Sequence, residues 1–236
     1  MARPSGHGEE YASRRTEVIR IAAEIFARQG YAATGVAELC EATQLGRGAL
    51  YYYIGSKENL LIEIQSSVMQ PLIAATRFIS ESPESGAARL RALSQVLLTA
   101  IFTQNDSIWV YQHEHRSLSG AEREALLAQR ATFEDLVHQL IDAAIEDRQI
   151  DVADSKLATF EFLNLHNYTY QWVKPDGPWT AEFLSARYMG TLLRGWAGPA
   201  LDLDAIEAEA VPLIAAVGDL PPVELGLASA SASVSI

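Results

Sequence analysis

The sequence is short of cysteine, of long apolar runs and of positive charge. A single cysteine, Cys40, among 236 residues excludes an internal disulfide framework and a thiolate-rich metal site. The N-terminal residues have no apolar segment typical of a secretory signal, and no stretch approaches the roughly 18 consecutive apolar residues of a membrane span. We therefore expect a cytoplasmic protein without membrane contact.

The deficit of positive charge is uneven along the chain. The formal charge of −12, from 18 basic and 30 acidic residues, by itself disfavours a nucleic-acid partner. Residues 1–65, however, hold seven basic and eight acidic side chains, so nearly all of the excess acid lies in the other 171 residues. An N-terminal segment that binds DNA beside an acidic body remains compatible with this distribution.

Apolar residues recur at helical spacing along most of the chain and predict an all-α protein. We expect four domains or segments: a flexible arm (1–13), a DNA-binding domain (14–62), a larger ligand-binding and dimerisation domain (63–218) and a low-complexity tail (219–236). The expected helices cover 11–29, 35–43, 47–53, 57–80, 87–104, 107–117, 120–148, 153–173, 180–197 and 201–217.

One segment, TGVAELCEATQLGRGALYYYIGSKE at 34–58, has a helix-turn-helix pattern. Thr34 is expected to cap the first short helix, and a turn at 44–46 leads to the second. In this motif the second helix enters the major groove and the first braces it. Gly46, Gly48 and Ala49 are small enough to let the second backbone approach DNA closely.

With the preceding Gly30-Tyr31 and the following Ser-Lys-Glu in register, this pattern resembles the DNA-binding head of the TetR family of bacterial transcriptional regulators. The resemblance covers about 14–62 and implies an all-helical homodimer, a repressor released from its double-stranded operator by a small molecule. It also implies the DNA-facing positions, while Gln44 departs from the glycine common in the family's turn. The predicted DNA-binding residues are Thr34, Arg47, Gly48, Tyr52, Tyr53 and Lys57.

The body should line an effector site with apolar and aromatic side chains and a few polar groups. Part of it resembles TetR-type regulators of fatty-acid and steroid breakdown, which respond to acyl-CoA thioesters. Arg116, Arg123 and Arg130 are then the cations for the ligand's phosphates, and an unspecified small apolar effector is the alternative. The predicted ligand-binding residues are Phe102, Trp109, His113, Arg116, Arg130, Phe133, Phe160, Asn167, Tyr168 and Trp172.

Other readings stay open at this point. His113 and His115, with His138 or His166, are a minor metal hypothesis, and we expect no metal site, cofactor or catalytic residues. An all-α enzyme or carrier that binds a hydrophobic ligand without DNA is the main alternative, and a protein-interaction module is a third.

The expected dimer interface uses the helices at 153–173 and 180–197. The second of these carries an apolar stripe that faces either the other subunit or the interior of its own. Its members are Leu184, Tyr188, Leu192 and Trp196.

Overall fold

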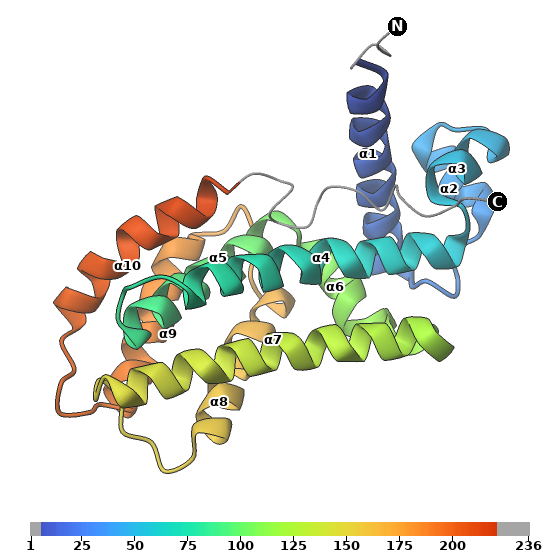
Figure 1. Ribbon diagram of the computed structural model, residues 1–236. Coiled ribbons are helices and arrows are strands. Elements are labelled where there is room, and N and C mark those ends of the chain that lie inside the picture. Colours follow the sequence, from blue (N-terminus) through green and yellow to red (C-terminus); the bar gives the residue numbers. More distant parts are fainter. Residues whose placement is uncertain (1–5, 221–236) are drawn as a thin grey trace, which may run out of the picture. The chain divides into compact units, whose positions relative to one another are not determined.

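The computed structural model describes residues 6–220, and within this range it is all-α, as the sequence predicts. Two short 3-10 turns, Glu114–Ser117 and Thr169–Gln171, interrupt the predicted helices at 107–117 and 153–173. The ten α-helices are α1 Gly6–Gln29, α2 Val36–Thr43, α3 Arg47–Ile54, α4 Lys57–Ser80, α5 Gly86–Thr103, α6 Asn105–His113, α7 Gly120–Glu146, α8 Ser155–Asn167, α9 Ala181–Gly195 and α10 Leu203–Gly218 (Figure 1).

The described chain divides into two compact units. One, here the head unit, contains 6–68 together with 106–126, and the other, the body unit, contains 69–105 together with 127–220. The head unit therefore includes α6 and the start of α7 in addition to the predicted DNA-binding segment. None of the helices within 6–220 is both long and apolar enough to cross a membrane.

Helix α1 starts well before the position that the sequence pattern indicates. It begins at Gly6 and thus includes 6–13, most of the predicted flexible arm. The rest of the predicted arm and the predicted tail beyond Leu220 lie outside the described residues. Val18, Ala22 and Phe26 form the apolar face of α1, and they are fully buried, as their helical spacing predicts.

The body unit is built around α5, which packs against α9 and α10 (Figure 1). Leu90, Leu93 and Leu98 of α5 are completely buried. Leu184 and Trp196, expected on the apolar stripe of α9, are also buried within this single chain, together with Met189 and Leu193. The other two members of the stripe, Tyr188 and Leu192, are half-buried. Two of its four members thus pack within this chain, while the other two keep part of their surface exposed.

Candidate DNA-binding surface and effector-binding residues

Helices α2 and α3 form the helix-turn-helix with a turn in the left-handed conformation. Gln44 ends α2 with φ 56° and ψ 32°, and the next amide, that of Leu45, donates to the carbonyl oxygen of Cys40 at 3.1 Å. Leu39 and Leu50 are fully buried and Ile54 nearly so, and these residues hold the two helices in the head core. Gln44 thus takes the left-handed conformation that glycine adopts most easily.

The outward side of α3 is open. Arg47, Gly48 and Ala49 are exposed, and a Cβ added at Gly48 would meet no atom within 4 Å. Tyr52 is 70% exposed, an unusual degree for a tyrosine, while its neighbour Tyr53 is half-buried. Arg47, Gly48 and Tyr52 therefore lie on one helix with exposed side chains or backbone, while Tyr53 is partly covered.

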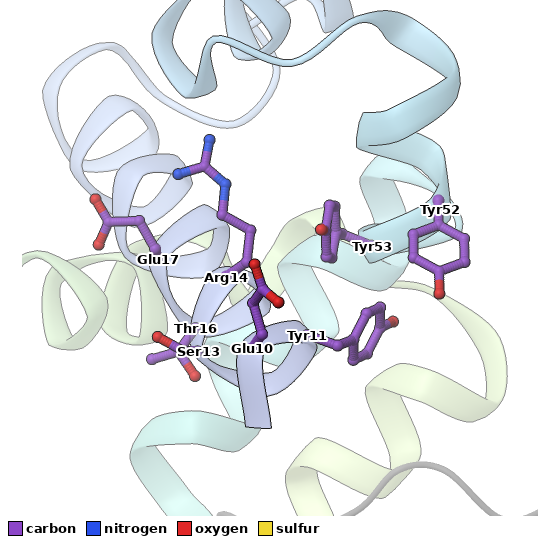
Figure 2. A pocket seen from close by; sticks show the side chains of 8 residues that line it. All are labelled: Glu10, Tyr11, Ser13, Arg14, Thr16, Glu17, Tyr52 and Tyr53. Atoms are coloured by element: carbon purple, nitrogen blue, oxygen red, sulfur yellow. The ribbon is translucent and has the colours of Figure 1, made fainter. Parts of the chain in front are cut away.

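Tyr52 and Tyr53 are in contact with the first turns of α1. Tyr11 of α1 lies at the edge of a groove that both tyrosines also line (Figure 2). The remaining residues around this groove come from α1, and they are mostly polar: Glu10, Ser13, Arg14, Thr16 and Glu17.

Two arginines that the sequence reasoning left unassigned connect α1 to the ends of the motif's helices. An Nη of Arg14 donates to the carbonyl oxygen of Thr43, the last residue of α2, at 2.8 Å. Arg15 donates through Nε to the carbonyl oxygen of Tyr53 in α3 at 3.3 Å and pairs with Glu63 at 2.8 Å. A cation at a helix C-terminus satisfies free carbonyls and favours the helix dipole. The sequence feature that could have indicated this role is the pair Arg14-Arg15, which lies next to the apolar stripe of α1.

Thr34 differs from its prediction in two ways. Its side chain is only 2% exposed, and its hydroxyl donates to the carbonyl oxygen of Gly30 at 2.9 Å. The residue before α2 is Gly35, and α2 has no side-chain cap. The hydroxyl stabilises the turn after α1. Thr34 therefore neither caps α2 nor presents its side chain at the surface.

Lys57 is half-buried at the start of α4. Its Nζ donates to the carbonyl oxygen of Tyr31 at 2.6 Å and lies 4.1 Å from the centre of the Tyr31 ring. Burial lowers the pKa of Lys57, and the nearby Glu114 carboxylate acts in the opposite direction. Glu114 also accepts a hydrogen bond from the Tyr31 amide at 3.0 Å. The ammonium group has three donors, so this contact leaves two of them for a phosphate.

The predicted effector-binding residues fall into both units. Trp109, His113 and Arg116 belong to the head unit, where the Trp109 ring stacks on His113 with centres 4.1 Å apart. The other seven belong to the body unit, where Phe133 is buried and Phe102 and Arg130 are half-buried.

Four of the seven lie on the surface of this single chain: Phe160, Asn167, Tyr168 and Trp172. Helix α8 buries Ala158, Phe162 and His166, and a residue two positions from Ala158 points to the opposite side of a helix. Phe160 therefore faces away from the body core, contrary to what a pocket lined within one chain requires. For the minor metal hypothesis, the described residues hold no group of three ligands that could bind a metal ion.

Comparison with known proteins places this arrangement among bacterial regulators. Residues 18–64 match the family described as bacterial regulatory proteins of the tetR family, and 83–196 match the tetracyclin repressor-like C-terminal domain. The HTH-type transcriptional repressor KstR2 of Rhodococcus jostii is 31% identical over 192 residues, which are 80% of this chain and 93% of that protein.

Solved structures agree with the sequence comparison. The ketosteroid transcriptional regulator KstR2 of Mycobacterium tuberculosis superposes with a TM-score of 0.73 at 25% identity, covering 78% of this chain and 95% of its own. AibR in complex with isovaleryl coenzyme A and operator DNA gives 0.68 at 25% identity, with 76% and 98% covered. These relatives are transcriptional regulators and not enzymes. The chain belongs to the TetR family of transcriptional regulators.

Proposed function

We propose that the protein is a homodimeric, cytoplasmic repressor that inserts α3 into the major groove of its operator and leaves the DNA when an acyl-CoA thioester binds the body. The observation that carries the DNA-binding part is the open side of α3, where Arg47, Gly48 and Tyr52 are exposed on one short helix. Arginine at such a position favours guanine edges, and a glycine lets the backbone come close to the groove.

The acyl-CoA part of the proposal is supported by chemistry and by a relative. AibR was solved with isovaleryl coenzyme A and operator DNA, and it covers most of this chain. Coenzyme A brings phosphates that need cations, and of the predicted cations Arg130 lies on α7 in the body unit. An effector shifts the protein off DNA only by the difference between its affinities for the two forms.

The proposed docking region for the second copy is α8, α9 and the segment between them, which carry exposed apolar side chains. Large apolar side chains that protrude from this region are unusual on the surface of a monomer. Trp172 and Trp179 are in edge contact, with ring centres 5.9 Å apart. The exposed apolar residues of the region are Leu157, Phe160, Tyr168, Trp172, Trp179 and Phe183.

The experiment that tests the proposal selects duplexes from a random pool and then measures their release by acyl-CoAs of different chain length. On the selected duplex, Arg47→Ala should relax the preference at one base pair. Lys57→Ala should weaken all duplexes evenly and lower the slope of log affinity against log salt by about 1. Arg77→Ala, an exposed arginine of the body unit, is the control and should change neither quantity.

Two results would contradict different parts of the proposal. If no duplex is enriched and binding to random DNA is insensitive to salt, the protein does not act on DNA through α3. If duplexes are enriched but acyl-CoAs fail to release them at concentrations that saturate the protein, the effector belongs to another chemical class.

A further inference from the structure

The first turns of α1 touch the end of α3 that carries the exposed tyrosines. The Tyr11 ring stacks on Tyr53 with centres 5.2 Å apart and an interplanar angle of 23°, and it meets Tyr52 edge-on at 5.4 Å and 80°. Tyr52 and Tyr53 also meet edge-on at 5.3 Å. Three rings from two helices therefore form one cluster in which each ring contacts the other two (Figure 2).

This contact matters because Tyr52 has few other constraints. A side chain that is 70% exposed on a short helix normally samples several rotamers, and fixing it on binding costs free energy. Edge-on contacts with Tyr11 and Tyr53 restrict its χ angles before DNA arrives. The Tyr52 ring keeps most of its surface accessible, so the same contacts leave it free to reach a groove.

Tyr11 can restrict its neighbours only if α1 is itself fixed against α3. Arg14 and Arg15, one turn after Tyr11, supply this restraint through their hydrogen bonds to the carbonyl oxygens of Thr43 and Tyr53. The Arg15 bond ends on Tyr53, the residue whose ring Tyr11 stacks on. The backbone and the ring of Tyr53 are thus both held by α1.

The charges around Tyr11 argue against a direct contact of its own with phosphate. Glu10 precedes it and lines the same groove, and Glu17 lies further along it (Figure 2). Arg14 donates to the Thr43 carbonyl, and Glu17 accepts hydrogen bonds from Arg20. A phosphate placed here would face carboxylates.

We propose that Tyr11 is a positioning residue for DNA recognition, which sets the orientation of Tyr52 and Tyr53 and thereby the base preference of α3. The inference rests on the proposed function, because it requires that Tyr52 or Tyr53 contacts the operator. It makes the start of α1, outside the helix-turn-helix itself, a determinant of specificity.

The test compares Tyr11→Leu, Tyr11→Phe and wild type on the selected operator and on a set of its single-base variants. Tyr11→Leu should weaken operator binding about 5-fold, the size expected for losing aromatic pairs that preorganise the site. It should also flatten the preference at the base pair where Tyr52→Ala does so. Tyr11→Phe keeps the rings and should restore both affinity and preference. Ala12→Ser, at an exposed position of α1 that does not line the groove, is the matched control.

A double-mutant cycle separates positioning from a general structural role. In a Tyr53→Ala background Tyr11→Leu should lose most of its effect, because the ring that it stacks on is gone. Additive losses, or a Tyr11→Leu loss that is equal on every base variant, would overturn the proposal. A loss in Tyr11→Phe as large as in Tyr11→Leu would overturn it as well, by pointing to a direct contact of the hydroxyl.

The proposed function has a separate readout in the same data. If Tyr52→Ala and Tyr53→Ala leave operator binding unchanged, the assignment of α3 tyrosines to the DNA fails, and the role of Tyr11 falls with it. If those two variants weaken binding while Tyr11→Leu is silent, only the positioning role is wrong.

Discussion

The head unit and the body unit both join their helices through arginine side chains, but these arginines differ in how deeply they are buried. In the head, half-buried Arg14 and Arg15 reach the free carbonyls at the ends of α2 and α3. In the body, Arg91 is 3% exposed and forms a two-pronged ion pair with Glu207 at 2.8 and 3.0 Å, while also donating to the Ser185 hydroxyl. The body arginine thereby joins α5, α9 and α10 from a buried position, although the Glu207 side chain is 47% exposed.

A buried histidine strengthens the contrast. His166 of α8 is completely buried, with Nδ1 2.7 Å from the carbonyl oxygen of Phe162 and Nε2 2.7 Å from the Ser94 hydroxyl. Because a carbonyl only accepts, Nδ1 carries the proton and Nε2 accepts from Ser94. The contacts of Arg14 and Arg15 lie nearer to solvent and can adapt to DNA more readily than the contacts of Arg91 and His166, whose side chains are buried. The following predictions test this difference.

The largest effect on the free energy of unfolding is expected at Gly86 of the body unit, where there is no space for one additional carbon atom. A Cβ added at Gly86 would overlap the backbone of Ala143 and Ala144 in α7. The neighbouring amides are fixed as well, since Gly86 and Ala87 donate to Asp147 and Gln149 at 2.7 and 2.9 Å. Gly86→Ala should therefore lower the free energy of unfolding by about 3 kcal/mol, measured by urea denaturation with tryptophan fluorescence.

Gly195→Ala is the matched control, because a Cβ there would meet nothing within 4 Å in the same unit. It should change the unfolding free energy by less than about 0.5 kcal/mol. Equal effects of the two variants would show that α5 and α7 separate easily, and the body would then be no more constrained than the head.

The second prediction uses the pH dependence of the body. Burial lowers the pKa of His166 to about 4 from 6.5, while the unfolded chain keeps the ordinary value. Between these two pKa values the unfolded state binds more protons, so stability falls as pH falls from 6.5 toward 4. This histidine should contribute a loss of about 2 kcal/mol in unfolding free energy between pH 7 and pH 5.

The measurement compares urea unfolding at the two pH values in wild type, His166→Gln and His113→Gln. His166→Gln should remove that part of the acid sensitivity even if it lowers stability at pH 7. His113→Gln, at an exposed position of the head unit, is the comparison variant. An unchanged loss in His166→Gln would mean that other groups dominate the acid response of the body.

The same difference explains what the sequence could and could not predict. The helices and the open face of α3 follow from local patterns: apolar spacing, glycines and residues at fixed offsets. The ion pair between Arg91 and Glu207 in the body cannot be predicted in this way, because the two residues are far apart in sequence. Neither of them differs from a surface residue in its local sequence pattern. The exposed position of Phe160 could not be predicted for a related reason, since periodicity gives the faces of a helix but not the one that turns inward.

In the head, the misassigned residue was Thr34, whose neighbours and spacing suit an N-cap. The hydroxyl instead bonds back to Gly30, because the chain turns tightly after α1 and buries the side chain. The roles of Arg14 and Arg15 were not predicted, because their hydrogen-bond acceptors are backbone carbonyls. Every residue has such a carbonyl, so the sequence does not indicate which ones act as acceptors.

The smallest expected effect compares one strained residue in each unit. Gln44 in the head and Arg148 in the body, with φ of 56° and 59°, are the non-glycine residues with positive φ among 6–220. A side chain in this conformation costs about 1 kcal/mol, and glycine relieves it at the expense of a more flexible unfolded chain. Gln44→Gly and Arg148→Gly should each raise the unfolding free energy by about 0.5 kcal/mol, whereas Gln44→Ala, which keeps its Cβ, should bring no gain. A gain at Arg148 without one at Gln44 would mean that the head relieves strain by shifting its turn, which would place the flexibility of the head in the helix-turn-helix itself.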